Sequence, residues 1–287
     1  MTISAALLAS GCGAEAADGV GGVVVAAGFF PLAEAAEIAG GDRVHVENLT
    51  PTGSDPHDVE LATDEVDTIL DAELLLYLGG GFQPGVEELA GRRADLSIDL
   101  LRDVDTLSEG GEVDPHVWLD PIRYASVVER IGRALAEVDR EGADAYLANA
   151  EGHAEEIRAL DARFERRLAA CEHDLLVVSH AAFGYLADRY GLRQEAISGI
   201  SPESEPDPQR LAELIDLVRA EGVTTVFTET LASPEVARTL AREAGVRTAL
   251  LNALEGLTPE EEAAGETYLS VMERNLETIA EGLGCPE

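Results

Sequence analysis

Three of the six histidines in this chain stand in short motifs whose composition suits the binding of a metal ion. His57 lies in the segment GSDPHD, His116 lies in DPHVW, and His180 closes the apolar run LLVVSH. Imidazole is the commonest protein ligand for metals, and three imidazoles with one further oxygen or water complete a tetrahedral zinc site. The three motifs therefore predict a metal site built from His57, His116 and His180.

An Asp-Pro pair directly precedes both His57 and His116. Proline holds its own φ near about −65° and biases the residue before it toward extended geometry, so the backbone that carries each histidine is stiffened. A ligand residue benefits from such preorganisation. Either aspartate, Asp55 or Asp114, could also accept a hydrogen bond from a ring N–H and so orient the imidazole.

The segments around these histidines alternate between strand and helix patterns. The apolar runs VVVAA, VHVENL and LLLYL are expected strands of the first half of the chain, and DLLVVSH, QEAISGI, VTTVFTE and VRTALLN are expected strands of the second half. Strands that alternate with helices predict parallel βαβ units, and open sheets of this kind bind ligands beyond the carboxyl ends of their strands. His180 stands at such an end.

Between these halves, residues 121 to about 170 read as nearly pure helix, with a break expected near DREGADA. The second helix would have about 28 residues and a length of ~42 Å, enough to serve both halves as a strut. We therefore predict an α/β fold of two lobes, each a parallel sheet with flanking helices, joined by one long rigid helix. The expected divisions are an N-terminal lobe at 21–140, the long helix at 141–171 and a C-terminal lobe at 172–287.

The charge of the chain restricts its partners. It has 56 acidic residues against 20 basic residues, all of them arginine, and a formal charge of −36. A field this negative repels phosphate backbones, so a nucleic-acid partner is excluded. It also destabilises the compact state unless salt screens it, and the Debye length falls to ~3 Å at about 1 M salt. We expect adaptation to high salt; an acidic protein of ordinary salinity is the alternative.

Residues 1–20 resemble a lipoprotein signal and linker, because a short apolar run leads to small residues and then to Cys12. The match departs from the pattern in two places: Ala9 stands where a leucine is expected, and no basic residue precedes the apolar run. We expect Cys12 to be lipidated and to anchor the protein; an incidental cysteine is the alternative. Cys171 and Cys285 could pair in an exported protein, which the sequence alone leaves open.

Five segments together resemble the metal-binding substrate-binding proteins of ABC importers for zinc and manganese. They are the stretch from FFPLAEAAEIAG to GSDPHDVE, then LLLYLGGGFQPGVEEL, DPHVWLDP, VVSHAAFGYLADRYGL and VFTETLASPEVARTLAREAGV, in family order from about residue 22 to 280. The resemblance implies two lobes on a long helix, a metal in the cleft between them, and delivery to a membrane permease. It also implies that His57, His116 and His180 are ligands.

The fourth ligand departs from the family pattern. The family usually has an aspartate, sometimes a glutamate, in a stretch resembling LDPLG, whereas this chain has LNALEG and places Asn252 there. The amide oxygen of Asn252 is neutral and a weaker ligand than a carboxylate. A water could fill the place, or Glu229 or Glu255 could substitute for it.

Three imidazoles favour Zn²⁺, and Mn²⁺ is the alternative because it prefers carboxylates and water. We expect a lipid-anchored monomer on the outer face of the cell membrane that captures the ion for its permease, and no enzyme activity. Two other functions stay open. A zinc-dependent hydrolase would use three histidines with an open fourth position, and a surface or adhesion lipoprotein could carry a vestigial site, since Asn252 replaces the acidic ligand.

Overall fold

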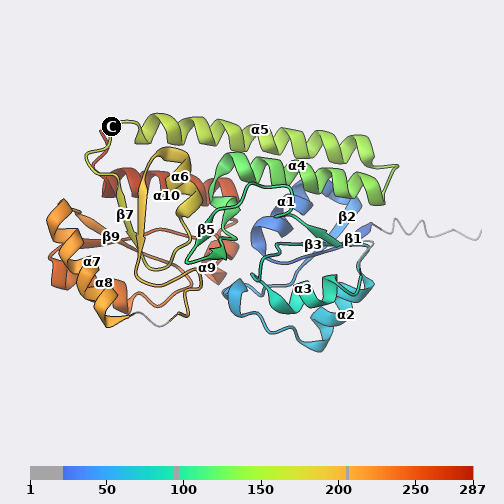
Figure 1. Cartoon of the computed structure of the whole chain (residues 1–287). Coiled ribbons are helices and arrows are strands. Elements are labelled where there is room, and N and C mark those ends of the chain that lie inside the picture. Colours follow the sequence, from blue (N-terminus) through green and yellow to red (C-terminus); the bar gives the residue numbers. More distant parts are fainter. Residues whose placement is uncertain (1–21, 94–96, 205–206, 287) are drawn as a thin grey trace, which may run out of the picture.

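The chain folds into two α/β lobes beneath a shared layer of long helices (Figure 1). The computed structural model describes residues 22–93, 97–204 and 207–286. Each lobe contains one four-stranded sheet, and every strand pairing within these two sheets is parallel. The predicted α/β fold with two parallel sheets is confirmed. The predicted anchor segment with Cys12 lies outside the described residues.

The sheet of the N-terminal lobe has the strand order β2-β1-β3-β4. Its central strands β1 and β3 consist of Val, Ala and Leu apart from Tyr77 and are largely buried, as is typical of parallel sheets covered by helices. Helices α2 and α3 pack on one face, and α1 and α4 pack on the other. The elements are β1 (Val23–Ala27), α1 (Phe30–Gly40), β2 (Val44–Asn48), α2 (Thr63–Asp71), β3 (Leu74–Tyr77), α3 (Pro84–Ala90) and β4 (Ser97–Asp99).

The sheet of the C-terminal lobe has the order β10-β9-β7-β8. Helices α7 and α8 cover one face, while α6 and α10 pack on the face turned toward the long helices. The elements are β7 (Leu175–Val178), α6 (Gly184–Tyr190), β8 (Arg193–Ala196), α7 (Pro208–Glu221), β9 (Thr225–Thr228), α8 (Glu235–Ala244), β10 (Arg247–Leu250), α9 (Pro259–Ala263) and α10 (Tyr268–Gly282).

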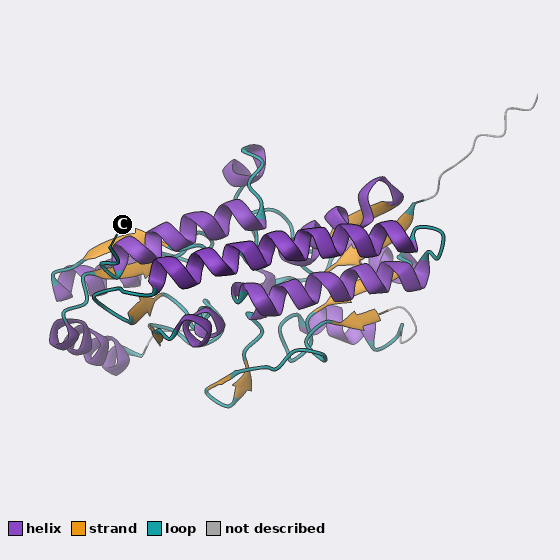
Figure 2. Ribbon diagram, turned by 90° about the horizontal axis from the view of Figure 1, so that it is seen from above, coloured by secondary structure: helices purple, strands orange, loops and turns teal. Residues whose placement is uncertain are grey.

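Helices α4 (Pro121–Val138) and α5 (Ala143–Leu168) form the shared layer, and α5 runs along both lobes (Figure 2). With 26 residues, α5 is ~39 Å long at about 1.5 Å per residue. Its first half packs on α1 and α4 and its second half on α6 and α10. The break that the sequence predicts lies between Val138 and Ala143.

The connection from β4 to α4 carries a short antiparallel hairpin of β5 (Ser108–Glu109) and β6 (Glu112–Val113). The described residues also form three short 3-10 helices, namely η1 (Gly41–Arg43), η2 (Pro56–Asp58) and η3 (Val117–Leu119). Two of them bear directly on the metal motifs, because η2 contains His57 and η3 begins directly after His116. No helix in the described part of the chain combines the length and the apolar character needed to cross a membrane.

A disulfide joins Cys171, just after α5, to Cys285, just after α10. The two cysteines are separated by 114 positions, and the closed loop contains all the strands and helices of the C-terminal lobe. The pairing that the sequence leaves open is therefore present in the structure, and it ties the end of the chain to the shared helix.

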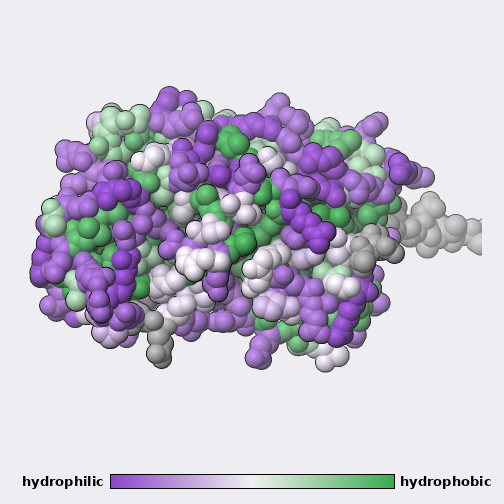
Figure 3. Space-filling model, viewed as in Figure 1, coloured by the Kyte–Doolittle hydropathy of each residue, from purple (hydrophilic) through white to green (hydrophobic). Residues whose placement is uncertain are grey.

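Hydrophilic residues cover most of the face shown in Figure 3, with paler residues near the junction of the lobes. The exposed large apolar side chains of the described residues are few and come from separate elements, namely Ile38, Leu70, Val113, Ile122, Leu147 and Leu250. Among the acidic residues that the structure describes, only Glu34, Asp114, Asp120, Asp161, Glu229 and Glu255 are buried, so dissolved ions can screen most of the others.

Candidate metal centre

Four side chains from four separate segments meet between the lobes: His57, His116, His180 and Glu255. His57 follows β2 and His180 follows β7, so two of them stand beyond the carboxyl ends of parallel strands. Glu255 follows β10 in the same way. One candidate ligand atom from each residue lies within 4.8 Å of all the others.

All three imidazoles direct the same nitrogen to one carboxylate oxygen. The Nε2 atoms of His57, His116 and His180 lie 3.1, 3.2 and 3.0 Å from Oε1 of Glu255. The side chains of His116 and His180 are fully buried, and those of His57 and Glu255 are only 7% and 4% exposed. Three imidazole nitrogens and one carboxylate oxygen in a dry pocket form a donor set that suits tetrahedral Zn²⁺.

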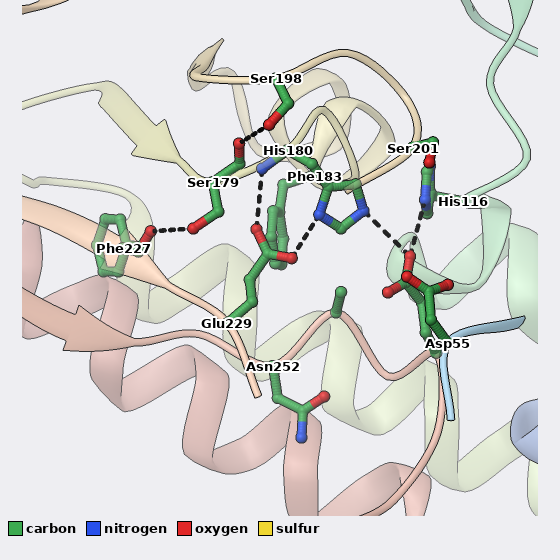
Figure 4. A network of polar contacts seen from close by, with 12 residues as sticks. Asp55, His116, Ser179, His180, Phe183, Ser198, Ser201, Phe227, Glu229 and Asn252 are labelled. Atoms are coloured by element: carbon green, nitrogen blue, oxygen red, sulfur yellow. Dashed lines mark hydrogen bonds and ion pairs between the residues drawn. The ribbon is translucent and has the colours of Figure 1, made fainter. Parts of the chain in front are cut away.

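Two of the imidazoles are oriented by buried carboxylates at their other nitrogen. Nδ1 of His116 lies 2.7 Å from Oδ1 of Asp114, and Nδ1 of His180 contacts Oε2 of Glu229. An ionised carboxylate can only accept a hydrogen bond, so both Nδ1 atoms carry the proton and both Nε2 atoms face the centre (Figure 4). Such carboxylates also make the imidazoles stronger ligands.

The two Asp-Pro motifs act in different ways. Oδ1 of Asp55 accepts a hydrogen bond from the backbone N–H of His57 at 2.8 Å, and Oδ1 of Asp114 accepts one from the backbone N–H of His116 at 3.0 Å. Only Asp114 also binds the ring of its histidine. The shared motif therefore fixes the backbone at both sites, and it orients the imidazole at one of them.

The buried histidines and Glu255 shift the pKa values of one another. Burial lowers the pKa of His180, but the carboxylates of Glu229 and Glu255 outweigh it and raise that pKa well above its usual value. Burial likewise opposes the shift at His116, whose pKa is raised by Asp114 and Glu255. For Glu255, burial favours the neutral acid, yet the three imidazoles hold its pKa well below the usual range. A metal ion must therefore displace protons from Nε2.

Aromatic rings close the pocket on the side of the N-terminal lobe. The ring of Phe82 packs edge-on against His57, with centroids 4.7 Å apart, and the ring of Trp118 lies 5.1 Å from that of His116. Nε1 of Trp118 donates a hydrogen bond to the carbonyl oxygen of Ala253 at 2.8 Å. This bond connects the segment of His116 to the segment that carries Glu255.

The side chain of Asn252, expected at the fourth position, makes its hydrogen bonds away from the three imidazoles. Its Oδ1 accepts a hydrogen bond from the backbone N–H of Leu254 at 2.7 Å, and its Nδ2 donates to Glu261 at 3.0 Å. In Figure 4 the amide points away from the imidazole of His180. Glu255, three residues further on, is the carboxylate that lies with the three histidines.

Glu229 also lies outside the set of four. Both of its oxygens are engaged by His180, one with the backbone N–H at 3.0 Å and the other with Nδ1. In these contacts Glu229 orients the imidazole of a candidate ligand. The sequence presents Glu255 only as a possible replacement for Asn252. The signal in the sequence that favours Glu255 is its position shortly after an expected parallel strand.

The comparisons with known proteins agree with this geometry. The family model described as zinc-uptake complex component A, periplasmic (ZnuA), matches residues 25–282. The zinc-binding lipoprotein AdcA of Streptococcus pneumoniae is 36% identical over 269 residues, which cover 88% of this chain and 54% of AdcA. The high-affinity zinc uptake system protein ZnuA of Bacillus subtilis is 31% identical over 274 residues, which cover 89% of this chain and 86% of that protein. The chain belongs to the ZnuA family of zinc-uptake components.

Solved structures show the same fold. The Zn(II)-bound ZnuA-like domain of Streptococcus pneumoniae AdcA superposes with a TM-score of 0.81 at 37% identity, covering 92% of this chain and 99% of that domain. The laminin-binding protein Lmb of Streptococcus agalactiae, described as having adhesin and metal-transporting activity, gives a TM-score of 0.84 at 28% identity, covering 91% of this chain and all of that one. This chain spans about half the length of the AdcA relatives that it matches.

Proposed function

We propose that this protein is an extracytoplasmic solute-binding component of an ABC importer, which captures Zn²⁺ between its lobes and delivers it to the membrane permease. The observation that carries the proposal is the convergence of three Nε2 atoms on Glu255, from four segments of the chain. Membership in the ZnuA family supports it, as does the likeness to a Zn(II)-bound domain.

The proposed ligands are His57 and His116 from the N-terminal lobe and His180 and Glu255 from the C-terminal lobe. Binding exchanges the waters of the ion for these four donors and connects the two lobes through the metal. One anionic ligand leaves a net charge of +1 on the bound cluster, which the carboxylates of Asp114 and Glu229 offset through their imidazoles. Three of the four proposed donors are imidazole nitrogens, which favour Zn²⁺ over Mn²⁺. The Irving–Williams order favours Zn²⁺ as well.

Two alternative functions, a lipoprotein with a vestigial site and a zinc-dependent hydrolase, are less well supported by the geometry. A vestigial site rested on the neutral side chain of Asn252, but Glu255 supplies an anionic donor in its place. A hydrolase requires a coordination position for water, whereas four protein donors already make up the number that a closed tetrahedral site needs. The geometry therefore favours binding and release over catalysis, and we propose that the protein is not an enzyme.

The remaining parts of the proposal concern placement in the cell. Lipidation at Cys12 would hold the protein as a monomer on the outer face of the membrane beside its permease. The lobes would extend over residues 21–140 and 172–287 with the helix 141–171 between them. The charge of −36 fits a salty medium, since salt screens repulsion between surface carboxylates.

Metal content tests the central proposal. The protein is purified in concentrated salt, stripped with a chelator, and offered equimolar Zn²⁺ and Mn²⁺ before the bound metal is counted. We expect one zinc per chain in the wild type and in His45→Ala, a matched control, because His45 lies on β2 with 70% of its side chain exposed. His180→Ala should reduce zinc affinity by more than the ~100-fold that marks the upper range for residues that only orient ligands.

An unaltered zinc affinity in His180→Ala would refute the ligand assignment. Delivery is tested separately in cells that lack their own solute-binding component and grow only when zinc is imported. The full-length protein should restore growth at limiting zinc, and Glu255→Gln should not. A Cys12→Ser variant found in the membrane fraction as abundantly as the wild type would contradict the anchor.

A further inference from the structure

We propose that Asn252 is a positioning residue, which shapes the loop after β10 so that Glu255 enters the metal centre. This inference rests on the proposed zinc-binding function and assigns a role to a residue that stands outside the four donors. Asn252 is 3% exposed and Glu255 is 3% exposed, so both lie in the interior of the protein. Only two residues lie between Asn252, whose side chain faces away from the imidazoles, and Glu255, whose side chain faces them.

The side chain of Asn252 closes a tight turn around Leu254. Its Oδ1 accepts the backbone N–H of Leu254 at 2.7 Å, which is the local hydrogen bond that asparagine makes in turns. Leu254 has a φ of +56° and is the only non-glycine residue with a positive φ among those that the structure describes. A side chain with a Cβ atom disfavours this conformation, so something must hold it. The hydrogen bond that Leu254 donates to Asn252 does so at the residue directly before Glu255.

Neighbouring elements hold the backbone of the same loop. Asn275 on α10 accepts the backbone N–H of Asn252 at 2.9 Å and donates its Nδ2 to the carbonyl oxygen of Asn252 at 2.7 Å. Asn275 is 1% exposed. The indole of Trp118 binds the carbonyl oxygen of Ala253. With the backbone of residues 252 and 253 fixed in this way, the Asn252 side chain decides the direction in which the chain leaves toward Glu255.

Both the oxygen and the nitrogen of the Asn252 side-chain amide have a hydrogen-bond partner. Nδ2 donates to Oε1 of Glu261, an oxygen that Arg274 also contacts at 3.3 Å. An aspartate at this position could still accept the N–H of Leu254, but it would set one carboxylate against another at Glu261. The amide therefore satisfies a donor and an acceptor at once, which explains why a neutral residue suits this place.

The test compares Asn252→Ala and Glu255→Gln, singly and combined, with the wild type. The readouts are zinc affinity, measured by competition with a chelating dye, and the visible absorption of the Co²⁺-loaded protein, which reports the number and kind of ligands. Asn252→Ala should weaken zinc binding at least about 10-fold and shift the Co²⁺ spectrum toward that of Glu255→Gln. The double variant should lose little more than either single variant, because both remove the same contact.

Asn149→Ala is the matched control, since Asn149 on α5 donates to the carbonyl oxygen of Ala39 at 3.2 Å and is not one of the residues around the centre. It should leave zinc affinity and the Co²⁺ spectrum unchanged. Asn252→Asp provides a second variant that keeps the acceptor for Leu254, and we expect it to bind zinc no more tightly than the wild type.

Three results would overturn the inference. A lower melting temperature of Asn252→Ala with unchanged affinity and spectrum would show that Asn252 only stabilises the fold. Additive losses in the double variant would show that Asn252 acts independently of Glu255. Tighter binding by Asn252→Asp that survives Glu255→Gln would make residue 252 a ligand position. A wild type that binds no zinc would instead refute the proposed function itself, and the inference with it.

Discussion

Replacing Glu34 with glutamine should remove a loss in the free energy of unfolding that the wild type suffers as the pH rises. Glu34 lies on α1 with 8% of its surface exposed, and both of its carboxylate oxygens face one donor, the backbone N–H of Tyr268, at 3.1 and 3.0 Å. Burial raises the pKa of Glu34 to about 7, the hydrogen bond from Tyr268 partly opposes the shift, and the charge of Glu37 adds to it.

The direction of the effect follows from proton linkage. Because the pKa of Glu34 is higher in the folded state than the value of 4.5 expected for a free side chain, the folded protein binds this proton more tightly than the unfolded chain does. The free energy of unfolding therefore falls as the pH rises from about 4.5 to about 7 and stays lower above that range. One pKa unit corresponds to ~1.4 kcal/mol, so the full cost is about 3 kcal/mol.

The assay is urea unfolding of metal-free protein between pH 4.5 and 8 at constant high salt. Glu34→Gln should match the wild type near pH 4.5 and exceed it by up to about 3 kcal/mol at pH 8. Other groups titrate alike in both proteins, so the difference between the two curves isolates Glu34. Glu155→Gln is the control for the loss of one charge, because Glu155 is exposed on α5. If the free energy of unfolding falls by the same amount in the wild type and in Glu34→Gln between pH 4.5 and 8, the reasoning is refuted.

Three further predictions concern the lobes and the centre. The double substitution Cys171→Ser and Cys285→Ser should lower the free energy of unfolding by roughly 4 to 5 kcal/mol, as expected for a closed loop of more than 100 residues; reductant should have the same effect on the wild type and none on the variant. Asp114→Asn should reduce zinc affinity about 10- to 100-fold by replacing the carboxylate that polarises the ring of His116 with a neutral amide, measured by chelator competition; an unchanged value would contradict the role of Asp114. Trp118→Phe leaves the carbonyl of Ala253 without its indole donor and should cost about 1 to 3 kcal/mol in urea unfolding, whereas a variant as stable as the wild type would show that this bond contributes nothing.

Much of the fold could be predicted because its signals are local. The apolar runs of β1 and β7 and the helical periodicity of α4 and α5 are visible in short windows of sequence, and their alternation predicts two parallel sheets with a long helix. The histidine motifs are equally local. Asp-Pro before His57 and His116, and the position of His180 after a buried strand, are read within a few residues each, and the structure brings these three side chains together.

The sequence by itself therefore determined the two lobes, the joining helix and the three histidines that face one centre, since each depends on periodicity or on neighbours along the chain. Only the tertiary structure decided that Glu255 rather than Asn252 joins them, because the direction of that side chain depends on a positive φ at Leu254 and on contacts from Asn275 and Trp118. The same holds for the Cys171–Cys285 disulfide and for the buried carboxyl of Glu34. The convergence of Glu255 with the histidines, the disulfide and the contact of Glu34 with Tyr268 each join residues far apart in the sequence, and no local pattern encodes these contacts.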